Sequence, residues 1–210
     1  MQLHRPLGVV TPTLDGDVLG VLAAATTSFT GRQVARLLPD HSQSGVHNVL
    51  RRLVRQGIVT VTAAGSAHLY SLNRDHLAAA YVIGLRQLQD QFRQRLAALV
   101  SEWPVPAEAV IVFGSAARGT MEPDSDIDLF VVRPASVDDD LWAEQTAVVT
   151  ERVSAWTGNQ ARIVEMTAAE VRDGLAHGDG LLLAIRDEGD VVVGDPRYLH
   201  RLERARMGAP

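Results

Sequence analysis

The sequence predicts an α+β protein, and three observations carry that prediction. Residues 15–57 contain three successive stretches with apolar side chains at helical spacing. Residues 58–73 then form two short runs in which apolar and polar residues alternate, as in a β-hairpin. After residue 105, strand-like and helix-like stretches alternate, which is typical of α/β or α+β domains. The chain is therefore expected to hold a helical part with a hairpin and a second part built on a sheet.

A long helix is predicted to link these two parts. Between His76 and Trp103 the apolar residues repeat at steps of three and four, which indicates one amphipathic helix. Pro104 and Pro106 interrupt this pattern and favour a domain boundary near residue 105. The helix could also pair with a copy of itself and make a homodimer. The expected parts are an N-terminal domain at residues 1–75, a linking helix at 76–104 and a C-terminal domain at 105–210.

The N-terminal part shows the order of a winged helix-turn-helix domain, namely three helices followed by a hairpin. The third helix has an apolar stripe, and its opposite face is rich in arginine and amide side chains. Such side chains read base edges or hold phosphates in DNA-binding helices, although they also simply keep a helix soluble. The expected DNA-contacting residues are Gln43, Ser44, His47, Asn48, Arg51 and Arg52.

Composition narrows the possible chemistry. The chain has no cysteine, which excludes thiol nucleophiles and zinc–cysteine sites, and all 20 of its basic residues are arginine. Residues 1–100 hold ten arginines against five acidic residues, whereas the remainder holds ten against twenty. This asymmetry suggests a polyanion as partner of the first half and a cation for the second. No secretory leader or membrane-length apolar run is visible, so a cytoplasmic protein without a membrane partner is expected.

A glycine turn in the C-terminal part predicts a phosphate site. Residues 110–113 read as a buried strand, and Gly114 follows directly, where the missing Cβ lets the backbone turn and approach a ligand. Ser115 then opens a helix, whose free N–H groups and dipole favour an anion. Arg118 lies one turn later and could add positive charge.

Two carboxylates on the next strand predict a metal site. Because side chains of a strand alternate between its faces, Asp126 and Asp128 should point the same way. Such a pair is repulsive unless a cation lies between its members. Mg²⁺, or Mn²⁺ in its place, suits one or two carboxylates together with the phosphates of a substrate. The alternative is that both acids are merely exposed residues of an edge strand.

The segments GSAARG and DSDIDL together resemble the G-S-x-x-x-G…D-x-D signature of the DNA polymerase β-type nucleotidyltransferase superfamily. The resemblance covers roughly residues 105–195 and is nearest to the minimal nucleotidyltransferases of prokaryotes. It implies a small antiparallel or mixed sheet flanked by helices. It also implies that Gly114 and Ser115 contact the phosphates of a nucleoside triphosphate, with ATP the expected donor, and that Asp126 and Asp128 hold metal.

One departure from the family pattern concerns the third carboxylate that members often carry on a later strand. Here that strand is expected at ARIVEM, where Arg162 stands at the position of the acid and Glu165 is the only carboxylate. Residues 162 and 165 should face opposite sides of the sheet. Either Glu165 reaches the site through a shifted register and completes the catalytic set, or the third acid is absent.

The expected activity is transfer of a nucleoside monophosphate to a hydroxyl acceptor, with DNA binding by the N-terminal domain. By analogy with similar minimal nucleotidyltransferases that act as antitoxins, the acceptor could be a partner toxin. The main alternative is a winged-helix transcription regulator whose nucleotidyltransferase-like domain only senses nucleotide. A third reading, an antibiotic-modifying transferase, is disfavoured because that activity does not need a DNA-reading module.

Overall fold

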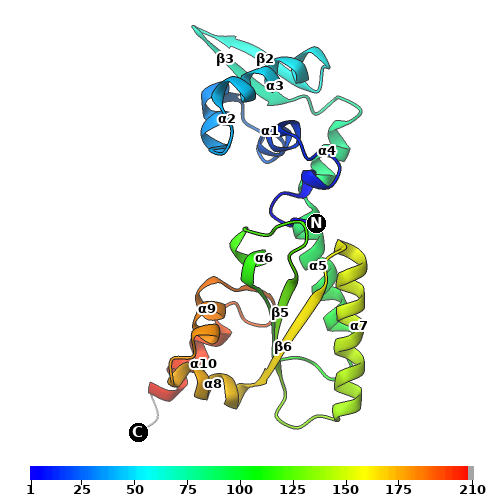
Figure 1. Cartoon of the computed structure of the whole chain (residues 1–210), viewed down its shortest axis with the longest axis vertical. Helices are drawn as coiled ribbons and strands as arrows, with labels where there is room; N and C mark the ends of the chain where they lie inside the picture. Colours follow the sequence, from blue (N-terminus) through cyan, green and yellow to red (C-terminus); the bar gives the residue numbers. More distant parts are fainter. Residues whose placement is uncertain (208–210) are drawn as a thin grey trace. The chain divides into compact units, whose positions relative to one another are not determined.

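The computed structural model describes residues 1–207, with side chains up to residue 204, and it is an α+β protein as expected. The chain divides into two compact units (Figure 1). The N-terminal unit spans Arg5–Gln89, and the C-terminal unit begins at Asp90 and also includes Met1–His4. None of the helices in the described part of the chain combines the length and the hydrophobicity that a membrane crossing needs.

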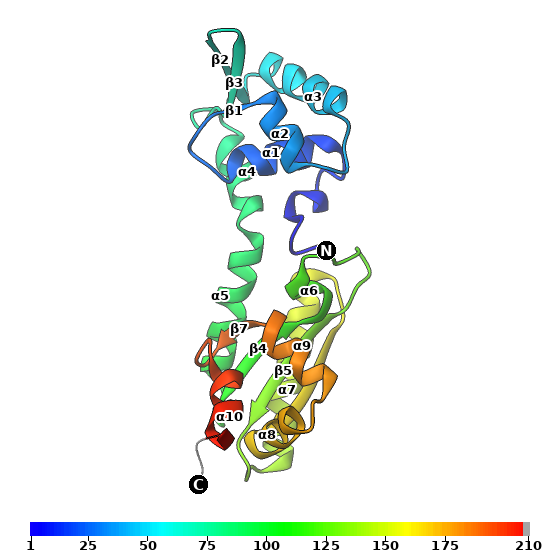
Figure 2. The same ribbon diagram turned by 90° about the vertical axis from the view of Figure 1, so that its left-hand side faces the viewer.

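The N-terminal unit contains the expected order of three helices and a hairpin. The α3 helix begins where the Ser42 hydroxyl accepts a hydrogen bond from the Gly45 N–H, at 3.1 Å, and its apolar stripe is buried in the core of the unit. An additional short strand pairs with the hairpin and gives the strand order β1-β3-β2. Figure 2 shows that the hairpin tip projects from the helices of this unit. Its elements are a 3-10 helix at Pro6–Val9, α1 (Leu14–Ala23), β1 (Phe29–Thr30), α2 (Gly31–Leu37), α3 (Gln43–Arg55), β2 (Val59–Ala64), β3 (Ala67–Leu72) and α4 (Ala79–Arg86). The winged-helix assignment of this arrangement stays a prediction.

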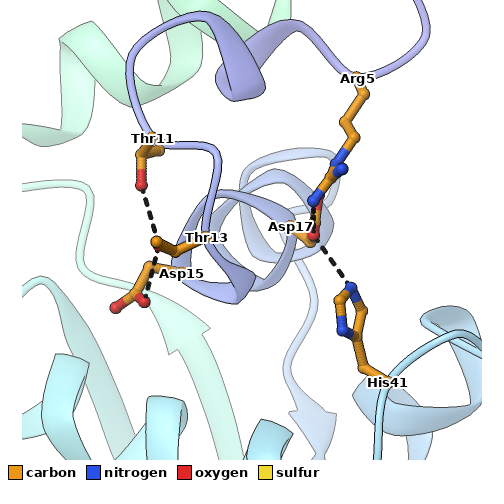
Figure 3. A network of polar contacts seen from close by, with 6 residues as sticks. All are labelled: Arg5, Thr11, Thr13, Asp15, Asp17 and His41. Carbon is orange, nitrogen blue, oxygen red and sulfur yellow. Dashed lines mark hydrogen bonds and ion pairs between the residues drawn. The ribbon is translucent and has the colours of Figure 1, made fainter. Parts of the chain in front are cut away.

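A polar network fixes the N-terminal segment to these helices (Figure 3). The Arg5 guanidinium donates two hydrogen bonds to the Asp17 carboxylate on α1, at 2.6 and 2.5 Å. His41, in the turn before α3, lies with its Nε2 3.2 Å from the same carboxylate. Asp17 is largely buried, and its hydrogen bonds raise the pKa of the Arg5 guanidinium. The network therefore joins three segments that are separated in the sequence.

The predicted linking helix is divided into two helices. α4 ends at Arg86 and α5 (Leu88–Ser101) follows after a turn at Gln87, whose N–H donates to the carbonyls of Ile83 and Gly84. The apolar face of α5 packs into the core of the C-terminal unit. The compact units divide in the first turn of this helix, between Gln89 and Asp90, and not at the prolines. Periodicity could not reveal that division because both helices keep the same apolar spacing.

The C-terminal unit is built on a mixed four-stranded sheet in the order β6-β5-β4-β7. β4 (Ala109–Phe113) pairs antiparallel with β5 (Ile127–Arg133) and with β7 (Asp190–Val193), whereas β5 and β6 (Ala161–Thr167) run parallel. The GDVVVGD segment therefore supplies an edge strand of the sheet, β7. The helices that follow or join these strands are α6 (Gly114–Arg118), α7 (Asp139–Thr157), α8 (Ala168–Ala176), α9 (Gly180–Glu188) and α10 (Tyr198–Met207).

The two faces of this sheet are covered by different helices (Figure 1). Ile127, Leu129 and Val131 of β5 are buried in a cluster with residues of α5 and α7. Phe130 and Val132 face the opposite side and are buried against α8, α9 and α10. Because successive side chains of a strand alternate, one residue of β5 in every two points toward each set of helices. The side on which a residue lies thus follows from its parity.

The α9 helix was not expected from the sequence. Its N-cap is Asp179, whose carboxylate accepts hydrogen bonds from the N–H groups of Leu181 and Leu182. Leu182 and Ile185 are the buried residues of this short helix. Two positions are too few to show a helical period in the sequence. α9 contacts α6, which places it beside the glycine turn.

Candidate active site

The glycine turn joins β4 to α6 and lies directly against one member of the carboxylate pair. Gly114 has φ +68°, a left-handed conformation that glycine adopts without strain. A Cβ at this position would lie 2.5 Å from Oδ2 of Asp128. Phe113, the preceding residue, is the register partner of Asp128 across β4 and β5. Glycine is therefore required both for the turn and for the close approach of the Asp128 carboxylate.

Asp126 lies just before β5, and Asp128 lies within it. A buried side chain holds the loop that leads to them: the Asn159 amide donates to the carbonyl oxygens of Pro123 and Ser125, at 3.0 and 2.7 Å. The Ile127 N–H donates to the Gln160 carbonyl at 2.8 Å. These bonds fix the backbone on both sides of Asp126. No sequence pattern indicates this role of Asn159, because a single asparagine after a helix is usually a turn residue.

The electrostatic state of Asp128 reflects its surroundings. Burial raises the pKa of its carboxyl, and the neighbouring Asp126 carboxylate raises it further. Arg162 and Arg118 act in the opposite direction and lower this pKa. Asp126 and Asp128 therefore interact as a pair, and the ionised pair gains from a nearby cation.

Arg162 is the cation nearest to this pair. It is the register partner of Asp128 between the parallel strands β5 and β6. Its Nη2 lies 2.7 Å from Oδ2 of Asp126, with the Arg162 side chain 66% exposed and that of Asp126 24% exposed. An arginine thus occupies the place where the family resemblance puts a carboxylate.

Glu165 does not join Asp126 and Asp128. It is paired with Val131, further along the strands, and its carboxylate accepts a hydrogen bond from Nε1 of Trp142 on α7. Glu165 also lines a groove of about 780 Å³ beside α7, and the alternation of β6 directs it to the opposite side of the sheet from Arg162. The alternation of β6 places it there without a bulge or a shifted register, so we correct the expectation that Glu165 belongs to the catalytic set.

The proposed phosphate ligands Ser115 and Arg118 both lie on α6. The first N–H groups of a helix lack intrahelical partners, and no side chain caps this one. Arg118 forms an ion pair with Glu188 at the end of α9, at 3.2 Å, and both side chains are about half exposed. Such an exposed pair is weak, so Arg118 is available to an anionic ligand.

The donor set fits one divalent cation shared with a polyphosphate. Asp126 and Asp128 offer carboxylate oxygens, which Mg²⁺ and Mn²⁺ prefer. Within residues 1–204, no cluster of three or more His, Asp or Glu side chains is placed to bind a metal. The two carboxylates therefore need oxygen ligands from a substrate or from water to complete a coordination shell.

The N-terminal unit brings part of its predicted polar set together. Gln43, Ser44 and His47 on α3 line a groove of about 910 Å³ with Arg32 and His68. A neighbouring groove of about 490 Å³ is lined by His47, Arg51, Arg55 and His68. Both grooves lie between helices and the β2–β3 hairpin and are rich in potential cations.

Asn48 and Arg52 lie outside these two grooves. The Asn48 side chain accepts a hydrogen bond from Arg51 at 2.8 Å, and both residues are exposed. Arg52 instead forms an ion pair with Asp15 on α1, with its Nε 3.1 Å from the carboxylate. From the sequence, Arg51 and Arg52 are equally good candidates for DNA contact. In the structure, Arg52 is paired with Asp15 of the same unit.

A short helix entered through a positive-φ glycine thus lies against two carboxylates at the end of a mixed sheet. In the comparison with family models, residues 91–171 match the nucleotidyltransferase domain family. Residues 91–171 therefore belong to a nucleotidyltransferase-type domain, which is an enzyme domain.

Solved structures of toxin–antitoxin proteins are distantly similar. One, described as a toxin–antitoxin with AMP-PNP, is 14% identical, with a TM-score of 0.39 over 55% of this chain and 83% of that chain. Another, a tri-AMPylated Shewanella oneidensis HEPN toxin in complex with MNT antitoxin, is 11% identical, with a TM-score of 0.35 over 57% and 87%. At these values the likeness assigns no activity to this chain. No curated protein matches the sequence.

Proposed function

We propose that this chain transfers a nucleoside monophosphate from a nucleoside triphosphate, with ATP the expected donor, to a hydroxyl acceptor. The observation that carries the proposal is the contact between the glycine turn and the carboxylate pair. Gly114 leaves the Asp128 carboxylate so close to the start of α6 that phosphate and metal would share one small site. A nucleotide phosphate needs both partners at once, because backbone N–H groups and a divalent cation each neutralise part of its charge.

The roles follow from position. Gly114 and Ser115 would hold the phosphates through the N–H groups at the start of α6, with Arg118 adding charge one turn later. Asp126 and Asp128 would hold Mg²⁺ or Mn²⁺. When bound, the metal supplies charge neutralisation and Lewis acidity at the reacting phosphate. Asn159 keeps the loop before Asp126 in place and is a positioning residue.

The acceptor class that we propose is a hydroxyl group on a partner protein, by analogy with antitoxin nucleotidyltransferases that modify a toxin. The purified chain would be incubated with Mg²⁺, each α-labelled nucleoside triphosphate and host lysate. The matched variants are Asp126→Ala/Asp128→Ala and the exposed loop variant Asp124→Ala. We expect metal-dependent label on a protein with the wild type and with Asp124→Ala, and none with the double variant. Label that survives in the double variant would contradict the assignment of these two carboxylates.

The second candidate function is a DNA-binding regulator whose nucleotidyltransferase domain senses nucleotide. The observation that favours it is Arg162, which stands where a third acid would serve as general base. Nucleotide binding by calorimetry, without transfer to any acceptor, would support this function over the first.

DNA binding by residues 1–75 is proposed for either case, because the grooves beside α3 carry Arg32, Arg51 and Arg55. Arg51→Gln should weaken binding to DNA and reduce the dependence of log K on log salt by about one unit. Arg52→Gln should change this dependence less, since Arg52 already has Asp15 as partner. Equal effects of the two variants in a salt titration would contradict the proposed docking face.

A further inference from the structure

The guanidinium of Arg162 lies on the same face of the sheet as the carboxylates of Asp126 and Asp128. Arg162 sits beside Asp128 in the register of β5 and β6 and reaches across to Asp126 at 2.7 Å.

The charge of the site limits what it can hold. Asp126 and Asp128 together contribute two negative charges when ionised, and Arg162 offsets one of them. One divalent cation is compatible with that balance, since the triphosphate supplies further negative charge. A second divalent cation bound to the same carboxylates would lie close to the Arg162 guanidinium. The two positive charges would repel each other.

The ligands point to the same limit. Two divalent ions in one site are usually bridged and flanked by several carboxylates, since each ion needs oxygen ligands of its own. In residues 1–204, no third His, Asp or Glu completes a metal-binding group with this pair. The carboxylate of Glu165 is directed toward Trp142 on the other side of the sheet and cannot take that place.

We propose that this nucleotidyltransferase site binds one divalent metal ion together with nucleotide, and that the Arg162 guanidinium occupies the place of a second ion. The inference rests on the proposed function, because it assumes that nucleotide and metal meet at Asp126 and Asp128. Arg162 then supplies a fixed positive charge to the phosphates or to the acceptor side of the site. The site consequently depends on a single ion and on one arginine of β6.

The test counts bound Mn²⁺ by electron paramagnetic resonance at saturating concentration of an α,β-methylene nucleoside triphosphate analogue, which is not cleaved. Asp126→Ala/Asp128→Ala shows how much Mn²⁺ remains when both carboxylate ligands are removed. We expect one ion in total per bound analogue for the wild type, the ion shared with the phosphates included. Arg162→Glu, which restores a carboxylate, should bind two. Arg152→Glu, the same change on the exposed surface of α7, should still bind one.

Two ions in the wild type would overturn the inference, and so would a single ion in Arg162→Glu that still folds and binds the analogue. If Arg162→Glu does not fold, Arg162→Gln decides. It keeps a polar side chain and removes the charge, so the dissociation constant for Mn²⁺ should fall about tenfold. An unchanged constant would overturn the inference. Failure of the wild type to bind the analogue would instead refute the proposed function itself, whereas bound analogue without Mn²⁺ refutes only the metal assignment.

Discussion

The two faces of the C-terminal sheet carry the same strands but differ in what their side chains do. On the α7 side, Ile127, Leu129 and Val131 continue one apolar cluster along the whole of β5. On the other side the series changes from acid to apolar residues, with Asp126 and Asp128 followed by Phe130 and Val132. Both faces of the strand therefore contribute buried apolar side chains, and only one of them ends in two acidic residues.

The largest effect is expected from Asp128→Asn, which keeps the shape of the side chain and removes its charge. A metal ion contributes several kcal/mol to transition-state stabilisation, so transfer should fall about a thousandfold. The exposed Asp124→Asn is the control and should transfer normally. Transfer within tenfold of the wild type would contradict the role of Asp128 as metal ligand.

The same variant should not be less stable when metal is absent. Burial and Asp126 raise the pKa of Asp128 in the folded state above its unfolded value, so folding favours the protonated form. The unfolding free energy of the wild type should therefore fall as pH rises from the ordinary aspartate pKa through the raised one. Asp128→Asn should lack this decrease. Denaturant titrations of both proteins across that range, with chelator present, measure the difference.

On the face of the sheet that packs against α7, Leu129→Ala should lower the free energy of unfolding and leave the transfer rate unchanged. Leu129 is fully buried, and a cavity at such a position costs about 3 kcal/mol. The midpoint of denaturant unfolding should shift accordingly, while transfer per folded molecule stays within a few-fold of the wild type. A loss of transfer as large as that of Asp128→Asn would mean that the two faces are not separable.

Gly114→Ala should combine both kinds of effect at smaller size. The added Cβ would meet Asp128 Oδ2, and alanine at φ +68° is strained by roughly 1 to 2 kcal/mol. Calorimetry should show weaker nucleotide binding together with a modest decrease in thermal stability. Gly158→Ala is the matched control, because it also has positive φ but nothing lies within 4 Å of its Cβ position. Equal nucleotide affinity in the two variants would contradict the crowding argument.

The smallest effect is expected from Glu165→Gln. The glutamine oxygen can still accept the hydrogen bond from Trp142, so the change in unfolding free energy should stay below about 1 kcal/mol. Transfer should remain within about twofold of the wild type. A hundredfold decrease in transfer would show that Glu165 belongs to the catalytic set. It would contradict the assignment of Glu165 to the face that packs against α7.

Local sequence patterns predict several helices and strands of this protein and its glycine–acid motif. The apolar run that follows Asp126 indicates a strand, and the spacing of apolar residues in the third predicted helix indicates a helix. The structure has β5 and α3 at these places. The link between Gly114 and the acid pair was also visible, because a glycine after a buried strand and two acids at alternate positions each restrict the backbone locally.

Other features depended on tertiary structure. The ion pairs of Arg162 with Asp126 and of Arg52 with Asp15 join residues 36 and 37 positions apart, and no local pattern selects such partners. Packing between distant segments also decides three other features. They are the turn at Gln87, the α9 helix, and the hydrogen bonds of Asn159 to the loop before Asp126. The sequence by itself indicated the glycine turn and the acid pair, because each is a local pattern of neighbouring residues. Only the folded chain decided which charges meet, since electrostatic and hydrogen-bond partners are chosen by distance in space.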